Sequence, residues 1–497
     1  MRLLLLCVLL VGVTQAAPTA NTTNTTTNDS LKAPSFTTRT LWSIISSSVL
    51  TIFACVYSAI HPNIPSPKHT SQLHGLWRQI RMVIMALIAP ELIVTWAMRQ
   101  WFSADQVTRQ FKELGYPSVR PESEEKKSFG APGTENRFLL DILLAFVCLF
   151  RLLARGILSV LVSLWRVLCA PVRWATRWIS KSEKPESGVE DFTWTQTHSF
   201  FVLMGGFMLY ANGKPHRTAS RTLQPNHILT LIRQRRIDVP ILTADQIHDR
   251  SKGNAISKGL VILQVAWFVM QLITRAIYHL ETTQLEVGTL AFAVLNFLTY
   301  AAWWDKPLNV QCPHPVYWKS TKSKSIVTPE DVIGVSEEDK ITQFGVLAPV
   351  LRPFLELIGF PGIPPSRELQ VPTFDGSIEL EQLHKHVLLL AGLLMATIFG
   401  GIHCMAWFFA FPTYQEQVLW RMSAVAITCT PWLGLLTAPL LAALDASLTL
   451  FILLYGSYIM LYITARGVLL VLMFTTLRDL PPDAYQTVLW TSLVPHL

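Results

Sequence analysis

Long apolar runs, each about the length of a membrane-spanning helix, are the dominant pattern along this chain. The clearest lies between His386 and Thr476, where about ninety residues include only four charged side chains, at Glu416, Arg421, Asp445 and Arg466. Hydrocarbon contains no water to bond backbone N–H and C=O groups, so such segments must form helices that satisfy their own backbone. The pattern predicts an all-α fold, a polytopic bundle of transmembrane helices.

We expect about seven spans, within a range of six to nine. Six apolar runs are predicted to cross, at residues 41–60, 260–278, 288–304, 386–410, 422–443 and 446–464, the last extending towards 476 with Arg466 snorkelling. A further run, 82–98, is interrupted by Pro90 and Glu91. Residues 199–210 are too short to cross, and we expect a re-entrant or protein-buried helix there.

The N-terminal region is typical of a secreted or luminal chain start. Residues 1–17 combine Arg2, an apolar core and small residues at the end, which predicts a cleaved signal peptide. The tail that follows, 18–40, carries three N-glycosylation acceptors at Asn21, Asn24 and Asn28. The mature N-terminus is therefore expected to be luminal or extracellular.

Polar segments divide the rest of the chain. The predicted regions are the first membrane helices (41–115), an insert (116–198), membrane helices with a basic loop (199–304), a proline-rich cytoplasmic insert (305–385), C-terminal membrane helices (386–476) and a tail (477–497). The basic loop holds most of the chain's excess positive charge, which favours the cytoplasmic side.

The insert contains an arginine pattern with helical spacing. Over residues 138–181 five arginines fall within an arc of about 80° at 100° per residue, namely Arg151, Arg155, Arg166, Arg173 and Arg177. This favours a helix lying along the cytoplasmic headgroups and binding anionic lipid. Two alternatives stay open: residues 138–153 cross the membrane, or the insert is an artefact of the gene model.

Composition agrees with the membrane interpretation. Of 497 residues 51% are hydrophobic and 15% are charged, whereas a soluble multidomain enzyme carries about a quarter charged residues. The net charge of +8 flanks apolar runs, so nucleic-acid binding is not expected. Seven cysteines form no CxxC pair, and the chain has no phosphate-binding loop, nucleophile elbow or metal-binding motif. Neither a metal nor a cofactor is predicted.

Glu91 is the strongest candidate for a residue with a chemical role. A carboxylate within a span is expensive in lipid and usually faces a cavity or a partner. Pro90 removes its own backbone donor and leaves the carbonyl of Ala86 without its helical partner, which creates a polar neighbourhood. Burial favours the protonated acid, so a proton carrier or general acid is one hypothesis, and a structural acid bonded to the freed backbone is the alternative.

A second set of polar residues lies on the later spans. Arg250, Ser257, Gln264, Gln271 and Arg275 fall within an arc of about 60°, which predicts one polar face. Asn296 and His403 could join this face in a substrate pathway, with His403 as a second catalytic candidate. Interhelical hydrogen bonds that hold the bundle together are the alternative for all of them.

Several local strings resemble an uncharacterised family of fungal multi-pass membrane proteins. They are the sequences HPNIP at 61–65, APE at 89–91 with RQW at 99–101, DRSKG at 249–253, FGGIH at 399–403 with AW at 406–407, and LRDLPPDAY at 477–485 with PH at 495–496. The resemblance extends over most of the chain from Leu41 onward and implies topology and a fungal source. The stretch between Tyr116 and Asp191 is longer than the family pattern.

Three functional hypotheses remain open from the sequence. The first is a transport-like protein with a polar pathway around Glu91. The second is a membrane enzyme that protonates a lipophilic isoprenoid or terpenoid substrate in secondary metabolism, and the third is a non-catalytic scaffold. The expected partners are the lipid bilayer and a lipophilic small molecule, and the expected location is a membrane of the fungal secretory pathway, the vacuole or the cell surface.

Overall fold

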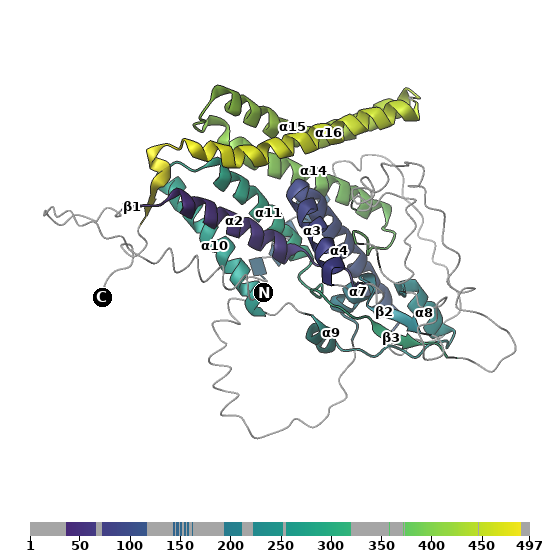
Figure 1. Ribbon diagram of the computed structural model, residues 1–497. Coiled ribbons are helices and arrows are strands. Elements are labelled where there is room, and N and C mark those ends of the chain that lie inside the picture. Colours follow the sequence, from purple (N-terminus) through teal and green to yellow (C-terminus); the bar gives the residue numbers. More distant parts are fainter. Residues whose placement is uncertain are drawn as a thin grey trace, which may run out of the picture. The chain divides into compact units, whose positions relative to one another are not determined.

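The computed structural model describes most of the chain (Figure 1). The described residues are 36–65, 72–116, 193–210, 222–251, 255–319, 373–445 and 447–488, together with Leu357, Val371 and parts of 143–162. Helices predominate in them, as predicted, alongside two small two-stranded sheets. Two compact units are present: unit 1 comprises 1–58, 260–297 and 393–497, and unit 2 comprises 59–259 and 298–392. The predicted signal peptide and the acceptors Asn21, Asn24 and Asn28 lie outside the described residues.

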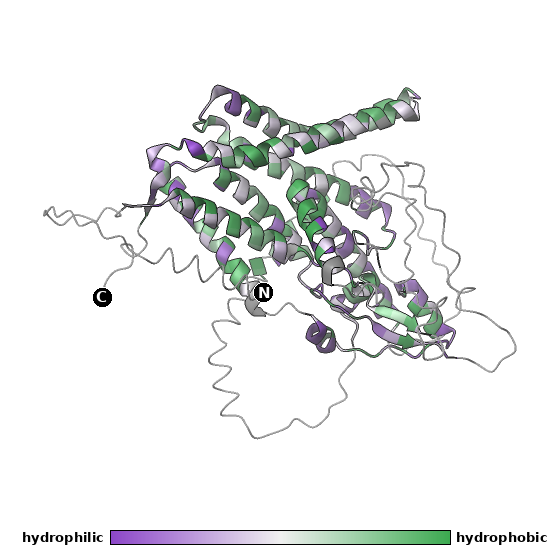
Figure 2. Ribbon diagram, in the orientation of Figure 1, coloured by the Kyte–Doolittle hydropathy of each residue, from purple (hydrophilic) through white to green (hydrophobic). Residues whose placement is uncertain are grey.

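Six helices in the described part of the chain are long and apolar enough to cross a membrane. They are α2 (Leu41–Ala59), α10 (Ala255–Ile277), α11 (Gln284–Ala302), α14 (Gln382–Cys404), α15 (Tyr414–Ala443) and α16 (Leu448–Thr475). Figure 2 shows hydrophobic residues along these helices. They correspond to the six runs predicted to cross. The seventh expected span, 82–98, is instead part of two helices that meet at a sharp bend.

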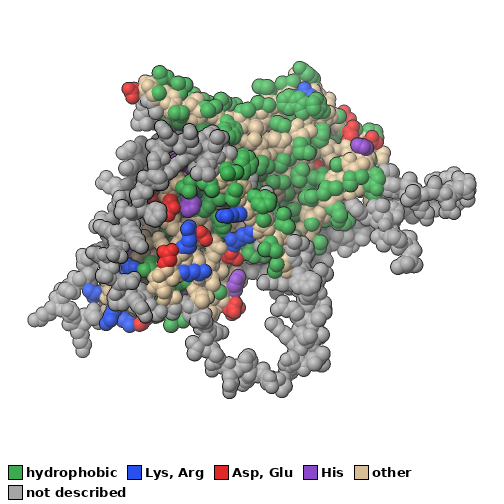
Figure 3. All heavy atoms as spheres, turned by 180° about the vertical axis from the view of Figure 1, so that it is seen from behind, with side chains coloured by type: hydrophobic (Ala, Val, Ile, Leu, Met, Phe, Trp, Pro, Cys, Tyr) green, Lys and Arg blue, Asp and Glu red, His purple; other side chains and the backbone are tan. Residues whose placement is uncertain are grey.

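Large hydrophobic side chains on α15 and α16 are exposed rather than buried. Leu436 and Leu453 are each 66% exposed, and Met422 is 65% exposed. Figure 3 shows hydrophobic side chains spread over much of the upper part of one face, while most of the visible Lys and Arg side chains lie lower on it. Exposed apolar surface of this kind is expected where lipid rather than water is the solvent. The class of protein is therefore an α-helical membrane protein.

Small residues allow the helices of unit 1 to approach closely. A Cβ atom at Gly400 of α14 would lie 2.0 Å from Oγ1 of Thr428 on α15, and one at Gly288 of α11 would lie 2.3 Å from Cε of Met473 on α16. At Gly400 the added Cβ would also lie 3.0 Å from the Thr428 Cα, so a larger residue displaces the partner helix, whereas at Gly288 the flexible end of the Met473 side chain can move. By contrast, no atom lies within 4 Å of the corresponding Cβ position at Gly401.

The two ends of the described chain meet in unit 1. Strand β1 (Phe36–Thr38), which precedes the first span, pairs in antiparallel fashion with β4 (Gln486–Val488), which follows the last one. Paired strands must lie on the same side of a membrane. An even number of crossings returns a chain to the side from which it started, and the six candidate helices of the described residues are compatible with this pairing.

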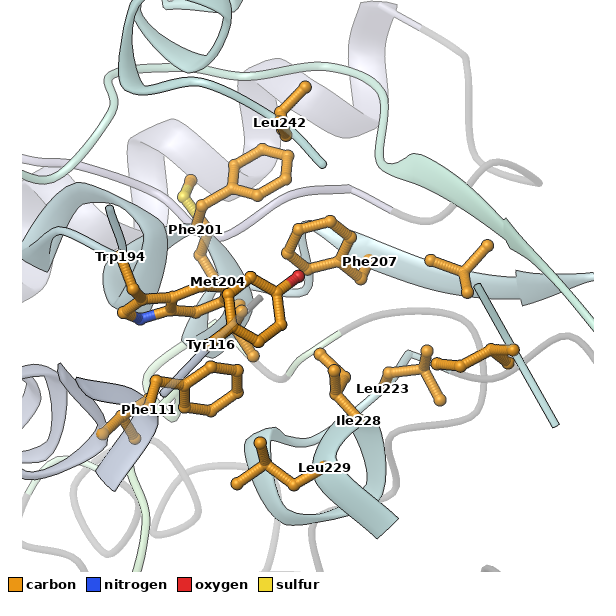
Figure 4. Packing of buried hydrophobic residues seen from close by; sticks show 14 of the residues in the cluster. Phe111, Tyr116, Trp194, Phe201, Met204, Phe207, Leu223, Ile228, Leu229 and Leu242 are labelled. Atoms are coloured by element: carbon orange, nitrogen blue, oxygen red, sulfur yellow. The ribbon is translucent and has the colours of Figure 1, made fainter. Parts of the chain in front are cut away.

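Unit 2 contains a hydrophobic core built by short elements (Figure 4). These are α7 (Gln196–Leu203), β2 (Phe207–Tyr210), α8 (Pro225–Arg233), α9 (Ala244–Arg250) and β3 (His314–Tyr317). Phe111, Tyr116 and Trp194 pack with Phe207 and Ile228 in this core, and all five are almost fully buried. Aromatic and aliphatic residues from these elements and from residues 107–116 thus give this unit a core of the kind found in water-soluble domains.

Residues 199–210 differ in part from the expectation. The protein-buried alternative holds for α7, whose residues from Thr197 to Leu203 are all buried, but the segment then continues as strand β2 instead of helix. β2 pairs in parallel with β3, so the ladder joins Phe207 to His314. The twelve-residue apolar run is short because it fills a protein core.

The predicted arginine helix is described only in part. Helical residues occur between 143 and 162, and Phe150 there is 73% exposed. Arg155 forms an ion pair with Asp305 and hydrogen bonds to Gln196, so its guanidinium is engaged by protein groups. Arg151 is exposed. The remaining members of the stripe, Arg166, Arg173 and Arg177, lie outside the described residues.

Candidate functional site

Glu91 lies at the bend between two helices of unit 2. Helix α3 (Gln72–Ile88) and helix α4 (Pro90–Glu113) meet at Ala89, and the two segments are bent by 112°. Pro90 opens α4, where its missing N–H leaves no helical hydrogen bond unmade. Glu91 is 6% exposed and sits in the first turn, where the positive end of the helix dipole favours an acidic side chain. We call α3 and α4 together the hairpin.

Both ends of the hairpin reach the same hydrophobic core. Ile64 precedes α3, and its N–H donates to the carbonyl of Met204 at 3.0 Å. Phe111 and Tyr116, at the end of α4, belong to the same buried cluster, with the rings of Phe111 and Trp194 stacked at 4.0 Å. The chain therefore leaves this core before the hairpin and returns to it afterwards.

Helix α4 runs alongside the first half of α14 in the opposite direction. The ring of Phe102 stacks on His384 at 4.9 Å between centroids. One Cβ at Gly392, near the midpoint of α14, would lie 3.1 Å from Oγ1 of Thr95. Glu91 is one helical turn beyond Thr95 in the same direction, since Oγ1 of Thr95 donates to the Glu91 carbonyl at 2.7 Å. The bend therefore lies about one helical turn from the point where Thr95 meets Gly392, near the midpoint of α14.

The polar face of α4 binds the backbone of the segment that precedes α14. The carbonyl of Asp375 accepts three hydrogen bonds, from Asn63 Nδ2 (2.9 Å), Trp96 Nε1 (3.2 Å) and Gln100 Nε2 (2.6 Å). Two more contacts follow along the helix, from Arg99 to the Phe374 carbonyl (3.1 Å) and from the Ile378 N–H to Ser103 Oγ (3.2 Å). These buried polar residues therefore fix residues 374–378 on α4.

Lys306 is buried against the same face. Its side chain is 3% exposed, and Nζ donates to Gln100 Oε1 at 2.9 Å and to Asn63 Oδ1 at 3.3 Å. Nζ also lies 4.6 Å from the ring centroid of Trp303 and 5.3 Å from that of Trp96. We call these four residues the Lys306 cage. Burial lowers the pKa of Lys306 well below its ordinary value.

Sequence reasoning missed Lys306 and its partners. A signal was present, because Trp303, Lys306 and Pro307 follow an apolar run directly, and a lysine at a span end next to tryptophans is a common interfacial pattern. That pattern predicts an exposed amine at the membrane surface. The burial depends on Asn63 and Gln100, which are more than two hundred residues away.

The predicted polar stripe of α10 is broken at its start. Arg250 belongs to α9, which ends there, whereas α10 begins at Ala255, so the stripe does not pass through Arg250. On α10, Gln264 donates to Thr51 Oγ1 on α2 at 3.1 Å, and Gln271 is half-buried. The side chain of Ser257 is outside the described residues. The contact of Gln264 is the kind of interhelical hydrogen bond that holds a bundle together.

Arg275 binds the C-terminal tail. Its guanidinium donates to the carbonyls of Gln486 at 2.7 Å and Asp483 at 3.1 Å, and to that of Glu281 in the α10–α11 loop. Nearby, Arg39 donates to the Ala484 carbonyl at 2.8 Å. These contacts dock the tail on the loop, within unit 1.

Asn296 and His403 each contact the backbone of one member of an aromatic pair. Asn296 Nδ2 donates to the Phe292 carbonyl of its own helix at 2.8 Å, and His403 Nδ1 lies 2.9 Å from the Phe399 carbonyl of its own helix. The rings of Phe292 and Phe399 meet at 5.5 Å. Arg466 is 3% exposed, with its guanidinium carbon 3.8 Å from the centroid of the Phe399 ring. The expectation that Arg466 snorkels is therefore wrong, because the aromatic faces hold the cation inside.

The candidate residues thus separate into two groups. Glu91 lies in unit 2, whereas Gln264, Gln271, Arg275, Asn296 and His403 lie in unit 1. Within the described residues, no cluster of three or more His, Cys, Asp or Glu side chains is placed to hold a metal ion. Glu91 has other buried polar side chains further along its own helix, at Thr95, Arg99, Gln100 and Ser103.

The length and hydrophobicity of these helices define a multi-pass membrane protein. One bent pair of helices in it has a buried carboxylate at the bend and a polar face along the second helix. The chain belongs to the Family of unknown function (DUF8562), whose model matches residues 4–127 and 173–347. The unmatched residues between these two parts lie inside the stretch 116–191 that was expected to exceed the family pattern. No curated protein and no solved structure matches the chain.

Proposed function

We propose that the hairpin is re-entrant and that Glu91, at its tip, carries protons in a transport-like pathway. The observation that carries this proposal is the placement of the two hairpin ends, at Ile64 and at Phe111 with Tyr116, in one hydrophobic core. A segment that leaves a core and returns to it ends on the side of the membrane where it began. The hairpin then dips into the bilayer without crossing it.

The depth of the tip supports a role in transport. Thr95 lies against Gly392, near the middle of a candidate span, and Glu91 is one turn further along. Non-helical backbone at such depth is found where it is buried in protein or lines an aqueous path, and broken helices bind substrates and ions in many transporters. The buried face from Glu91 through Thr95 to Gln100 supplies polar groups from the tip to the Lys306 cage.

A scaffold role is the second candidate, and one observation favours it. Asn63, Trp96 and Gln100 all donate to the carbonyl of Asp375, which is the pattern of a structural clamp. In that case the polar face of α4 serves to hold residues 374–378, and Glu91 completes the fold at the bend. The two functions differ in whether protons move.

Proton flux separates them. The full chain is reconstituted in liposomes that contain a pH-sensitive dye, and a potassium diffusion potential drives protons inward. We expect wild-type flux above that of protein-free liposomes, loss of this flux in Glu91→Gln, and partial retention in Glu91→Asp. Glu113→Gln, at the exposed end of α4, is the matched control and should conduct as the wild type does.

Two results would contradict the proposal. Wild-type flux equal to that of empty liposomes, with lower abundance of Glu91→Gln in cells, would favour the scaffold. Unchanged abundance, no flux, and the loss of a lipophilic metabolite in cells that express Glu91→Gln would favour the acid-catalysing membrane enzyme.

The cellular setting is part of the same proposal. A luminal N-terminus with glycans on Asn21, Asn24 and Asn28, after removal of residues 1–17, would put Ile64, which follows the first span, on the cytoplasmic side of a fungal secretory-pathway, vacuolar or plasma membrane. The exposed apolar residues near Phe150 support contact of the insert with the cytoplasmic leaflet, and Arg151 is available there to anionic lipid. Glycosidase digestion of the expressed chain tests the N-terminal part directly.

A further inference from the structure

The amides of the Lys306 cage are oriented by a backbone carbonyl. Asn63 and Gln100 each use their NH₂ group to donate to the Asp375 carbonyl, which leaves each amide oxygen turned towards Nζ of Lys306. The Gln100 oxygen accepts a further hydrogen bond from Trp303 Nε1 at 2.9 Å. The cage therefore presents two fixed acceptors and two indole faces to one amine.

The number of acceptors matches an uncharged amine. A neutral primary amine has two N–H donors, and the two amide oxygens accept from Nζ. A charged ammonium has three N–H donors and a full positive charge, which is costly to bury without a carboxylate, and the indole faces of Trp96 and Trp303 offset only part of that cost. Among the residues that the structure describes, Lys306 forms no ion pair.

The charged and titratable groups of the packed elements are engaged elsewhere. On α4 Arg99 donates to the Phe374 carbonyl, and Glu91 lies nine residues before Gln100. The Asp375 carboxylate accepts from Ser377 at 3.3 Å, and Asp305 pairs with Arg155. His61 is the remaining neighbour, with its ring 5.7 Å from that of Trp303. Thus none of these carboxylates neutralises a charge on Nζ.

We propose that Lys306 is held as an uncharged amine in the folded protein and is a proton-binding site that loosens unit 2 when it is occupied. This inference concerns the charge state of one buried amine and stands whether or not Glu91 carries protons. Its ligand is a proton, which a base at the end of a span takes up from the adjoining aqueous side.

The pH dependence follows from linkage. An unfolded lysine has a pKa near 10.4, and burial lowers the pKa of Lys306 in the folded chain. Between the two values the unfolded chain binds a proton that the folded chain does not, so stability falls as pH decreases through this window. The equilibrium constant for unfolding should rise by up to about tenfold for each pH unit of decrease.

Two substitutions at Lys306 distinguish a charged from an uncharged amine, because the two charge states predict opposite effects on stability. Methionine has similar length and no charge, whereas arginine cannot lose its proton. If the amine is uncharged, Lys306→Met in the full chain in detergent loses two hydrogen bonds but no charge, and it should be much less destabilised at pH 7.5 than Lys306→Arg. Lys306→Arg should be strongly destabilised or fail to fold. Lys112→Met and Lys112→Arg, on the exposed end of α4, are the matched controls and should both behave like the wild type.

The pH profile supplies a readout that a purely structural role would not change. We expect the midpoint temperature of the wild type to rise between pH 7.5 and pH 10 relative to that of Lys306→Met. Lys112→Met should retain the rise. A wild type and a Lys306→Met variant with parallel pH profiles would overturn the inference. So would a Lys306→Arg variant that is as stable as the wild type, because a permanent charge would then be accommodated in the cage.

Discussion

Arg39 and Glu286 form a bidentate ion pair that joins the segment before the first span to the start of α11. Their atoms Nη1 and Oε1 are 2.5 Å apart, Nη2 and Oε2 are 3.2 Å apart, and Glu286 is 2% exposed. Glu286 also accepts from the N–H and the hydroxyl of Thr283, which completes a capping box at the start of α11. The Glu286 carboxylate thus caps the start of α11 and binds the segment that precedes the first span.

Removing the Glu286 carboxylate should destabilise the folded protein. Glu286→Gln keeps the size of the side chain but leaves the Arg39 guanidinium without its counter-charge, and breaking a buried pair in this way costs about 3–5 kcal/mol. We expect a clear drop in the midpoint temperature of the full chain in detergent. Glu281→Gln, in the adjacent loop, is the control, because Glu281 is exposed and contributes its backbone carbonyl to Arg275. Equal stability of the two variants would contradict this role.

Close helix contact at Gly400 gives a second prediction. Alanine there would place Cβ 2.0 Å from Thr428 Oγ1 and 3.0 Å from the Thr428 Cα, so α14 and α15 must separate. Gly401→Ala meets no atom within 4 Å and should be tolerated. Thermal unfolding of both variants decides the question, with Gly400→Ala expected to unfold at the lower temperature by an amount typical of overpacking, about 1–3 kcal/mol.

His198 makes unit 2 sensitive to acid. Its Nε2 lies 2.6 Å from the Leu242 carbonyl, and its Nδ1 lies 3.1 Å from the Thr195 N–H, an arrangement that suits a neutral ring. Desolvation by burial lowers the pKa of His198 from its ordinary value of 6.5. Between 6.5 and the lowered pKa of the folded chain, the unfolded chain binds a proton that the folded chain does not, so stability is lost as pH falls through this window, at up to about 1.4 kcal/mol per pH unit.

The variant His198→Gln tests the contribution of His198 to the pH dependence of stability. In His198→Gln the decline of the midpoint temperature between pH 6.5 and pH 5 should be shallower than in the wild type. His248→Gln, on the exposed side of α9, serves as the control and should keep the wild-type slope. A wild-type slope in His198→Gln would show that the acid sensitivity of unit 2 originates in other groups.

The membrane helices could be predicted from the sequence because their signal is local. A run such as 422–443 is apolar at nearly every position, and lipid requires such a run to be a helix. The structure starts the corresponding α15 eight residues earlier, at Tyr414. Polar residues at the ends of spans carry no equivalent signal, so the boundaries were less well defined than the helices.

Other parts of the fold and the site could not be predicted from the sequence, because they depend on contacts between residues far apart along the chain. For the apolar run at 199–210 the sequence left a re-entrant and a protein-buried helix open, because its core partners, among them Phe111 and Ile228, are provided by other parts of the chain. Arg466 was expected at an interface because the sequence does not show that Phe399 lies beside it. Glu91 was recognised from its conflict with the surrounding apolar residues, whereas Lys306, at the end of a span, presented no such conflict.

The side of the membrane on which the hairpin ends lie is the most direct test of the account. Single cysteines are introduced within 66–71 and at Lys112, in a full chain whose own cysteines are replaced by alanine, and sealed vesicles are treated with a membrane-impermeant thiol reagent. We predict that both positions react from the same side, opposite to a cysteine placed in the tail after Val488. Labelling of Lys112→Cys and of the 66–71 cysteine from opposite sides would show that the hairpin crosses, and would contradict a re-entrant tip at Glu91.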